Sequence, residues 1–136
     1  MYPESLVKPM KAELTGSGFE DLSNPEAVEK AIKQEGTVLV VVNSVCGCAA
    51  GAARPGVKLS LNNTKKPGKL VTVFAGFDTE AVAQARKHFA PYPPSSPCIA
   101  LFKNGELVHF VERHNIEGRT AQMIAEHLKL VYEEFC

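Results

Sequence analysis

The longest unbroken run of β-branched and other apolar residues, TVLVVV, lies at positions 37–42. Such a run is typical of a strand buried on both faces, in a sheet that helices cover. Two further runs, KLVTVF at 69–74 and CIALF at 98–102, predict two more strands. The segment LVHFV at 107–111 predicts a returning strand. It follows a turn at Lys103-Asn104-Gly105-Glu106, where Asn-Gly is the strongest short hairpin signal.

Helical periodicity fills most of the sequence between and around these strands. Apolar residues recur at helical spacing in three segments, which predict helices over 25–34, 79–89 and 118–135. The sequence AAGAARPGVKLSLNN, which follows the first strand and its cysteines, also has helical character. We expect a kink near Pro55, because proline cannot donate the helical hydrogen bond. In the N-terminal stretch we expect Pro9 to interrupt any helix.

The order of these elements predicts the fold class. The first half implies parallel strands joined by helical crossovers, and the second half ends in an antiparallel hairpin and a covering helix. We therefore predict an α/β protein, a three-layer sandwich in which helices flank a central mixed sheet. We assign residues 1–136 to a single domain with an N-terminal helical extension, a size that suits one hydrophobic core.

Composition narrows the function classes. Fifteen basic residues balance fifteen acidic ones, which argues against a broad surface for nucleic acid or for an anionic membrane. No apolar run approaches the roughly 20 residues that a membrane span needs. The N-terminus lacks a basic-then-apolar leader pattern, so the cytoplasm is the expected location. The four cysteines are too few and too irregularly spaced for a secreted disulfide framework.

Two of these cysteines, Cys46 and Cys48, follow the first strand directly, where reactive groups of α/β sheets gather. A helix N-terminus offers unpaired N–H groups and a partial positive charge, and both favour thiolate over thiol. Cys46 lies just before the predicted helix and Cys48 lies on its first turn. We therefore assign Cys46 as the attacking thiol and Cys48 as the resolving thiol. No basic residue lies immediately before the pair.

The single residue between the two cysteines is Gly47. Cysteines two positions apart can form a disulfide only in a narrow set of backbone conformations, and glycine widens that set. Strain in the oxidised form would make such a bond easy to reduce. This spacing suits a thiol that accepts a mixed disulfide and passes it on.

The same cysteines are compatible with two other kinds of site. Both could be small buried apolar residues, or they could bind a metal. Two thiolates suit Cu(I), whereas zinc would need further ligands from Cys98, Cys136 or the four histidines, none of which has zinc spacing. We expect no metal, a buried Cys98 at the start of an apolar strand, a loose terminal thiol at Cys136, and histidines without ligand roles.

Several motifs together resemble one known family. The segments NSVCGCAAGAARP, TVFAGFD, SSP and HFVERHNIEG resemble the bacilliredoxins, which have a thioredoxin fold. The similarity runs from near Pro9 to Cys136. The resemblance implies thiol–disulfide exchange, in which bacillithiol, a low-molecular-weight thiol, is removed from mixed disulfides on cytosolic proteins. Members of the family have also been regarded as weak disulfide isomerases.

The resemblance also implies roles for individual residues. Cys46 becomes the nucleophile, Cys48 the resolving cysteine and Pro97 a cis-proline, while the backbone of Ser96 hydrogen-bonds the chain of the bound substrate. Bacillithiol is then a co-substrate and no cofactor is bound. The partners are bacillithiolated or disulfide-containing proteins, with no nucleic acid and no membrane. Cys98, directly after the proline, departs from the pattern expected of the family. Its two possible roles are a buried, inert thiol and a third redox partner.

Three alternative functions stay open on the sequence. One is a protein disulfide isomerase of broad specificity, and another is a copper- or zinc-binding module that uses the same two thiolates. The third is a redox sensor or adaptor that binds partners without turnover.

Overall fold

The structure is a computed structural model that describes all 136 residues. Its sheet has five strands in the order β1-β3-β2-β4-β5. β1 (Glu20–Asp21) pairs parallel to β3 (Lys69–Phe74), which pairs parallel to β2 (Thr37–Asn43). β4 (Cys98–Lys103) is antiparallel to β2, and β5 (Glu106–Val111) is antiparallel to β4. The predicted mixed sheet is therefore confirmed.

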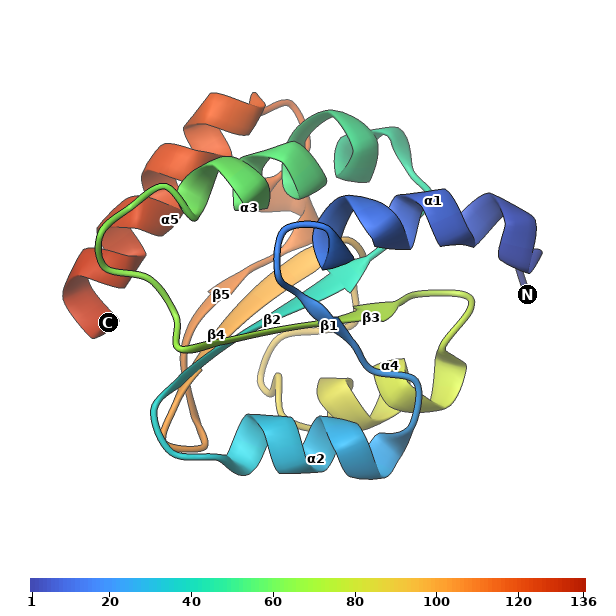
Figure 1. The fold of residues 1–136 in the computed structure, drawn as a ribbon, viewed down its shortest axis with the longest axis horizontal. Coiled ribbons are helices and arrows are strands. Elements are labelled where there is room, and N and C mark those ends of the chain that lie inside the picture. The colour runs from blue at the N-terminus through green and yellow to red at the C-terminus, as the bar shows by residue number, and fades with distance from the viewer.

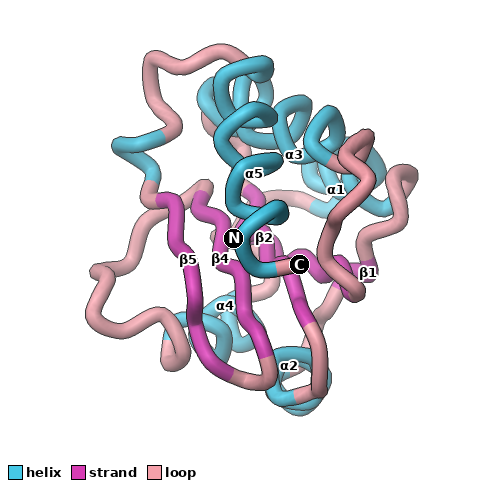
Figure 2. Tube along the Cα trace, turned by 90° about the vertical axis from the view of Figure 1, so that its left-hand side faces the viewer, coloured by secondary structure: helices cyan, strands magenta, loops and turns pink.

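Helices cover both faces of this sheet, as Figures 1 and 2 show. α1 (Glu4–Thr15), α3 (Arg54–Ser60) and α5 (Ala121–Phe135) lie on one face. α2 (Pro25–Lys33) and α4 (Thr79–Arg86) lie on the other. The arrangement is the predicted three-layer α/β sandwich. No helix is both long enough and apolar enough to cross a membrane.

The alternating residues of β2 build both cores. Val38, Val40 and Val42 point into a cluster of 17 buried residues shared with α2 and α4. Leu39 and Val41 point into a cluster of 15 buried residues shared with α1, α3 and α5. A strand that is apolar at every position therefore fixes β2 in the middle of the sandwich. The carboxyl end of β2 therefore lies at the edge of the sheet, between the two helical layers.

The turn between β4 and β5 forms as the Asn-Gly pair predicts. Asn104 and Gly105 have φ angles of 51° and 85°, the left-handed values that a two-residue hairpin requires. The Asn104 side chain also accepts a hydrogen bond of 2.8 Å from the backbone N–H of Gly36. The turn is therefore tied to the segment that leads into β2.

Some predicted boundaries were wrong. The short strand β1 was not predicted, because two exposed acidic residues carry no strand pattern. α4 ends at Arg86, and α5 begins at Ala121 because the Thr120 hydroxyl caps it by accepting from the Met123 N–H at 3.1 Å. Pro9 does not interrupt α1. It lies on the solvent-exposed side, where water can bond the carbonyl that proline leaves free.

The irregular turn after the cysteines lies before Pro55 rather than at it. Residues Ala49–Ala53 form one turn of π-helix, and Pro55 then occupies the first turn of α3. Proline is tolerated there because the N–H groups of a first helical turn lack partners in any case. The wider turn precedes the regular helix and follows Cys48 directly. Such π turns are frequent at functional sites.

Gly56 sets the distance between α3 and α5. A Cβ atom at this position would lie 2.7 Å from Cβ of Ile124 and 3.1 Å from the Ala121 carbonyl oxygen. We predict that Gly56→Ala lowers the free energy of unfolding by about 1–3 kcal/mol, because the added methyl overpacks this contact. The measurement is the midpoint of urea unfolding at a constant m-value. Gly51→Ala is the matched control, since a Cβ there meets no atom within 4 Å. An equally small effect of both changes would contradict the prediction.

Candidate active site at the carboxyl end of strand β2

The two cysteines lie where β2 leads into the helical segment. Cys46 and Cys48 are free thiols and both are half-buried, so each remains open to solvent. Their sulfur atoms lie 2.7 Å apart, and either thiol can donate to the other. The Cys46 carbonyl accepts hydrogen bonds from the Ala49 and Ala50 N–H groups at 3.1 and 3.2 Å, which closes the first turn. The pair is therefore positioned at a helix start, as the sequence predicts.

Several hydrogen bonds stabilise the Cys46 thiolate. Burial raises the pKa of Cys46, but donation from the Cys48 thiol, the Ser44 hydroxyl and the Ala49 and Cys48 N–H groups lowers it more, so the pKa lies below the usual thiol value. The Ser44 Oγ lies 3.3 Å from the Cys46 sulfur. It also accepts the Cys46 N–H at 3.3 Å. Ser44 is a contributor that the sequence analysis missed.

The pKa of Cys48 is shifted in the opposite direction. Burial raises the pKa of Cys48, and the neighbouring Cys46 sulfur raises it further through its hydrogen bond and its charge. Since one proton is shared between two sulfurs, the favoured singly ionised state has the charge on Cys46 and the proton on Cys48. This division suits an attacking thiolate at Cys46 with a resolving thiol beside it.

The loop that carries Ser96 and Pro97 meets the cysteines from the neighbouring strand. Antiparallel pairing puts Cys98 of β4 opposite Val42 of β2, so the two residues before Cys98 lie near the carboxyl end of β2. The Ser96–Pro97 peptide bond is cis and Pro97 is buried. The Ser96 carbonyl accepts a hydrogen bond of 3.1 Å from the Arg113 Nη1, whereas its N–H has no partner within the chain.

Arg113 is a basic group close to the thiols that the sequence immediately before the cysteines does not supply. It lies two residues beyond β5, and its charge attracts the thiolate forms of both cysteines, Cys46 most strongly, which raises the pKa of the guanidinium. Its Nε also lies 3.3 Å from the Glu117 carboxylate. The sequence held one indication of this role. The Asn-Gly hairpin predicts that the end of the returning strand lies near the start of the strand before it, and the observed pairing of Val111 with Ile99 puts Arg113 beside the proline loop.

A buried arginine holds the segment before Cys46. Arg54 is 2% exposed, and its Nη1 donates to the Asn43 Oδ1 at 3.0 Å and the Ser44 carbonyl at 2.7 Å. Its Nε lies 3.2 Å from the Glu13 carboxylate of α1. Asn43 in turn donates to the Met10 carbonyl at 3.2 Å. The N-terminal helix is thereby connected to the end of β2, and Arg54 acts on the backbone before Cys46 rather than on a sulfur.

The other two cysteines lie outside this arrangement. Cys98 is buried at 1% exposure, and burial raises the pKa of its thiol to about 12. It is therefore a thiol at any physiological pH, consistent with the inert alternative. Cys136 is exposed at the end of α5, and partial burial of its sulfur raises its pKa. The structure contains no group of three or more His, Cys, Asp or Glu side chains placed to hold a metal ion.

Comparisons with known proteins agree with this geometry. The family model described as disulphide isomerase matches residues 2–136. A bacilliredoxin of Cytophaga hutchinsonii is 66% identical over 134 residues, 98% of this chain and 99% of the relative. A bacilliredoxin of Halalkalibacterium halodurans is 52% identical over 136 residues, 99% of this chain and 94% of the relative.

The chain belongs to the bacilliredoxin family. Solved structures place it in the thioredoxin fold. Mitochondrial thioredoxin 3 of Saccharomyces cerevisiae matches with a TM-score of 0.60 at 15% identity, covering 90% of this chain and 98% of that one. Thioredoxin of Trypanosoma brucei brucei matches with a TM-score of 0.61 at 17% identity, covering 86% and 93%. Fold and relatives together identify a thiol–disulfide oxidoreductase.

The charge of Arg113 near Cys46 leads to a testable prediction. We expect Arg113→Gln to move the pH midpoint of iodoacetamide alkylation at Cys46 to higher pH, because the thiolate loses a neighbouring positive charge. Alkylation needs the thiolate, so its rate rises with pH and levels off above the pKa of Cys46. The wild-type protein should therefore level off at lower pH than an ordinary thiol does.

The matched variant Arg113→Lys keeps the charge and should keep most of the wild-type pH profile. Mass spectrometry of the alkylated peptides assigns the rate to Cys46. Identical midpoints for the wild type and for Arg113→Gln would show that the guanidinium does not act on the thiolate.

Proposed function

We propose that this protein removes bacillithiol from mixed disulfides on cytosolic proteins, with Cys46 as the nucleophile and Cys48 as the resolving cysteine. The observation that carries the proposal is the thiol pair, in which hydrogen bonds favour a thiolate on Cys46 and a retained proton on Cys48, with the Arg113 charge nearby. The names of the relatives support the choice of bacillithiol as the small thiol.

The reaction has two exchange steps. The Cys46 thiolate attacks the bacillithiol sulfur of the mixed disulfide, the old S–S bond breaks, and the target protein leaves as its thiolate. Cys46 then carries bacillithiol in a new disulfide. A second bacillithiol thiolate attacks the bacillithiol sulfur of this adduct, so the bacillithiol disulfide forms and the Cys46 thiolate leaves. Alternatively, the Cys48 thiolate attacks the Cys46 sulfur, so the Cys46–Cys48 disulfide forms and bacillithiol leaves as its thiolate. In each step one S–S bond forms and one breaks, so no bound cofactor is needed.

The loop at Ser96 and Pro97 is assigned to substrate binding. The Ser96 N–H has no partner within the chain, so it can donate to a carbonyl of the substrate backbone. Its carbonyl already accepts from Arg113, which orients the peptide unit. This arrangement supports recognition of an extended substrate chain beside the thiols through one main-chain hydrogen bond.

A second candidate is a disulfide isomerase of broad specificity. It is favoured by the description of the matching family model, disulphide isomerase. The same Cys46 thiolate would then attack a protein disulfide, and Cys48 would release chains that stall as mixed disulfides.

One experiment separates the two candidates. Release of bacillithiol from a bacillithiolated protein and refolding of scrambled ribonuclease are measured in the same buffer with the same amount of protein. We expect bacillithiol release to be accelerated strongly and refolding only weakly. Strong refolding without accelerated bacillithiol release would favour the isomerase, and acceleration of neither reaction would refute both.

A further inference from the structure

A hollow of about 360 Å³ opens beside the thiol pair. Backbone of Gly47 and Gly51 lines one side, together with Cys48, and the segment that leads into α5 lines the other. A Cβ atom at Gly47, Gly51 or Gly118 would meet no atom within 4 Å, so the space next to each glycine is open. A small molecule joined to Cys46 would have room here, because the two sulfur atoms are neighbours.

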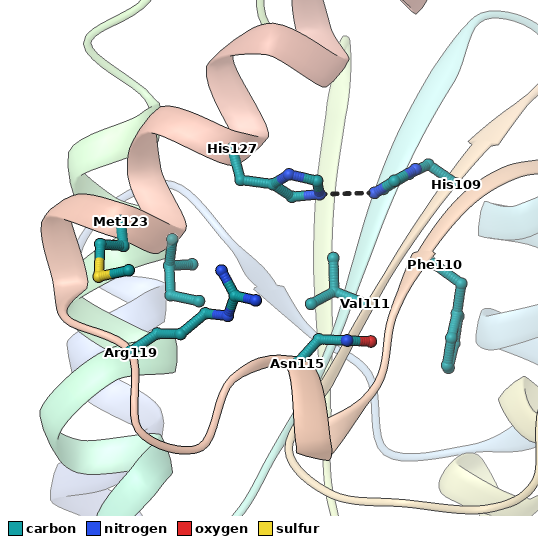
Figure 3. A pocket seen from close by; sticks show the side chains of 8 residues that line it. His109, Phe110, Val111, Asn115, Arg119, Met123 and His127 are labelled. Atoms are coloured by element: carbon teal, nitrogen blue, oxygen red, sulfur yellow. Dashed lines mark hydrogen bonds between the residues drawn. The ribbon is translucent and has the colours of Figure 1, made fainter.

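Arg119 lines this hollow and also a second one of about 220 Å³ between β5 and α5. Figure 3 shows the guanidinium of Arg119 and the imidazoles of His109 and His127 extending into the space of the second hollow. The His109 and His127 Nε2 atoms lie 2.8 Å apart, and Asn115 completes the polar lining. The remaining lining residues are apolar: Phe110, Val111, Met123 and Ile124.

The side chains around Arg119 favour the binding of an anion. No acidic side chain lines the second hollow, and every polar side chain there carries at least one N–H donor, since a neutral imidazole retains one. The one carboxylate that lines the first hollow, Glu117, is already paired with Arg113 at 3.3 Å. Arg119 makes no ion pair and no side-chain hydrogen bond within the chain. Its guanidinium is therefore free to bind a carboxylate through two N–H donors.

We propose that Arg119, with His127 and His109 behind it, binds a carboxylate of the low-molecular-weight thiol that is exchanged at Cys46. The inference rests on the proposed function and adds which residues hold the acidic end of the small thiol. The thiol body would lie along the glycine-lined hollow, with its sulfur at Cys46 and its acidic end at Arg119. Neutral small thiols would react at the same sulfur without this contact.

The kinetic test uses the Cys48→Ser background and two symmetrical disulfides, those of mercaptosuccinate and of 2-mercaptoethanol. The Cys46 thiolate attacks one sulfur of the disulfide RSSR, the S–S bond breaks, RS⁻ leaves, and Cys46–S–S–R forms. The mass of the adduct gives the second-order rate constant. We expect Arg119→Gln to slow the reaction with the acidic disulfide about five- to tenfold and with the neutral one less than twofold.

The control variants separate local contact from net charge. Lys66→Gln removes one positive charge from an exposed residue that lines neither hollow, and it should leave both rate constants unchanged. Arg119→Lys should retain part of the preference, and His127→Gln should lose a smaller part than Arg119→Gln. Equal slowing of both disulfides, or no slowing of the acidic one, would overturn the inference.

An equilibrium measurement does not depend on the reaction at Cys46. Methylthiosuccinate is a thioether and cannot exchange, so its binding reports the carboxylate contact alone. We expect it to shift the NMR signals of Gly118, Arg119 and the His127 ring in the wild type and not in Arg119→Gln. If these signals stay unmoved, the acidic subsite is absent. Failure of Cys46 to form any adduct would instead refute the proposed function, while the NMR result would still decide the subsite.

Discussion

Replacing Cys46 with serine will abolish release of bacillithiol from a modified protein, whereas Cys48→Ser will leave a measurable part of it. Serine is close to cysteine in size, but its hydroxyl does not ionise near neutral pH and cannot replace the thiolate. Cys48 acts only after bacillithiol has moved to Cys46, and a second bacillithiol can perform that release instead. Cys46→Ser should therefore have no catalysed rate, whereas Cys48→Ser should keep a reduced one.

The control for this pair is Cys136→Ser, which removes an exposed thiol at the chain end. It should keep the wild-type rate. The rates are measured by mass spectrometry as loss of the bacillithiol mass from the modified protein over time, with a fixed excess of free bacillithiol in every reaction. A Cys46→Ser variant with the wild-type rate would show that another residue is the nucleophile. Complete loss in Cys48→Ser would show that the second bacillithiol cannot act as the releasing thiol.

Replacing Arg54 with alanine will lower the free energy of unfolding by about 3 kcal/mol. The guanidinium is buried and donates to the Asn43 side chain and to the Ser44 carbonyl. Alanine leaves the buried Ser44 carbonyl without that partner and opens a cavity between α3 and the end of β2. Because Ser44 also positions the Cys46 sulfur, alkylation of Cys46 at neutral pH should slow in the same variant.

Two further variants test whether this effect is specific to Arg54. Arg54→Lys keeps the charge but not the planar set of donors, so it should recover only part of the stability. Lys58→Ala removes an exposed basic residue of the same helix and should change stability by less than about 0.5 kcal/mol. Urea unfolding followed by far-UV circular dichroism measures all three. An Arg54→Ala variant as stable as Lys58→Ala would contradict the structural role assigned to the guanidinium.

The sequence predicted the sheet and the location of the thiols because both depend on local signals. The run TVLVVV is typical of a strand with two buried faces, and Asn104-Gly105 predicts the hairpin between the last two strands. The cysteines lie directly after that strand, so the end of the sheet at which they lie followed from the topology. The ends of the helices were predicted less well, because a single capping residue such as Thr120 decides where a helix begins.

The surroundings of the thiols could be predicted only in part. Ser44 and Arg113 act on Cys46 through side-chain geometry, and Arg113 is brought there by strand pairing between β4 and β5. Arg54 follows the thiols in sequence, yet it points back to the backbone before them. Such contacts depend on the three-dimensional arrangement of several elements, whereas the periodicity of the sequence reports on one element at a time.

The most direct test of the central claim is the mass of the Cys48→Ser variant after incubation with a stoichiometric amount of a bacillithiolated protein. The account predicts that the variant gains the mass of one bacillithiol at Cys46 while the target protein loses the same mass. This result requires the Cys46 thiolate to attack the bacillithiol sulfur. A disulfide between Cys46 and the target protein, or an adduct at Cys98 or Cys136 with Cys46 unmodified, would contradict it.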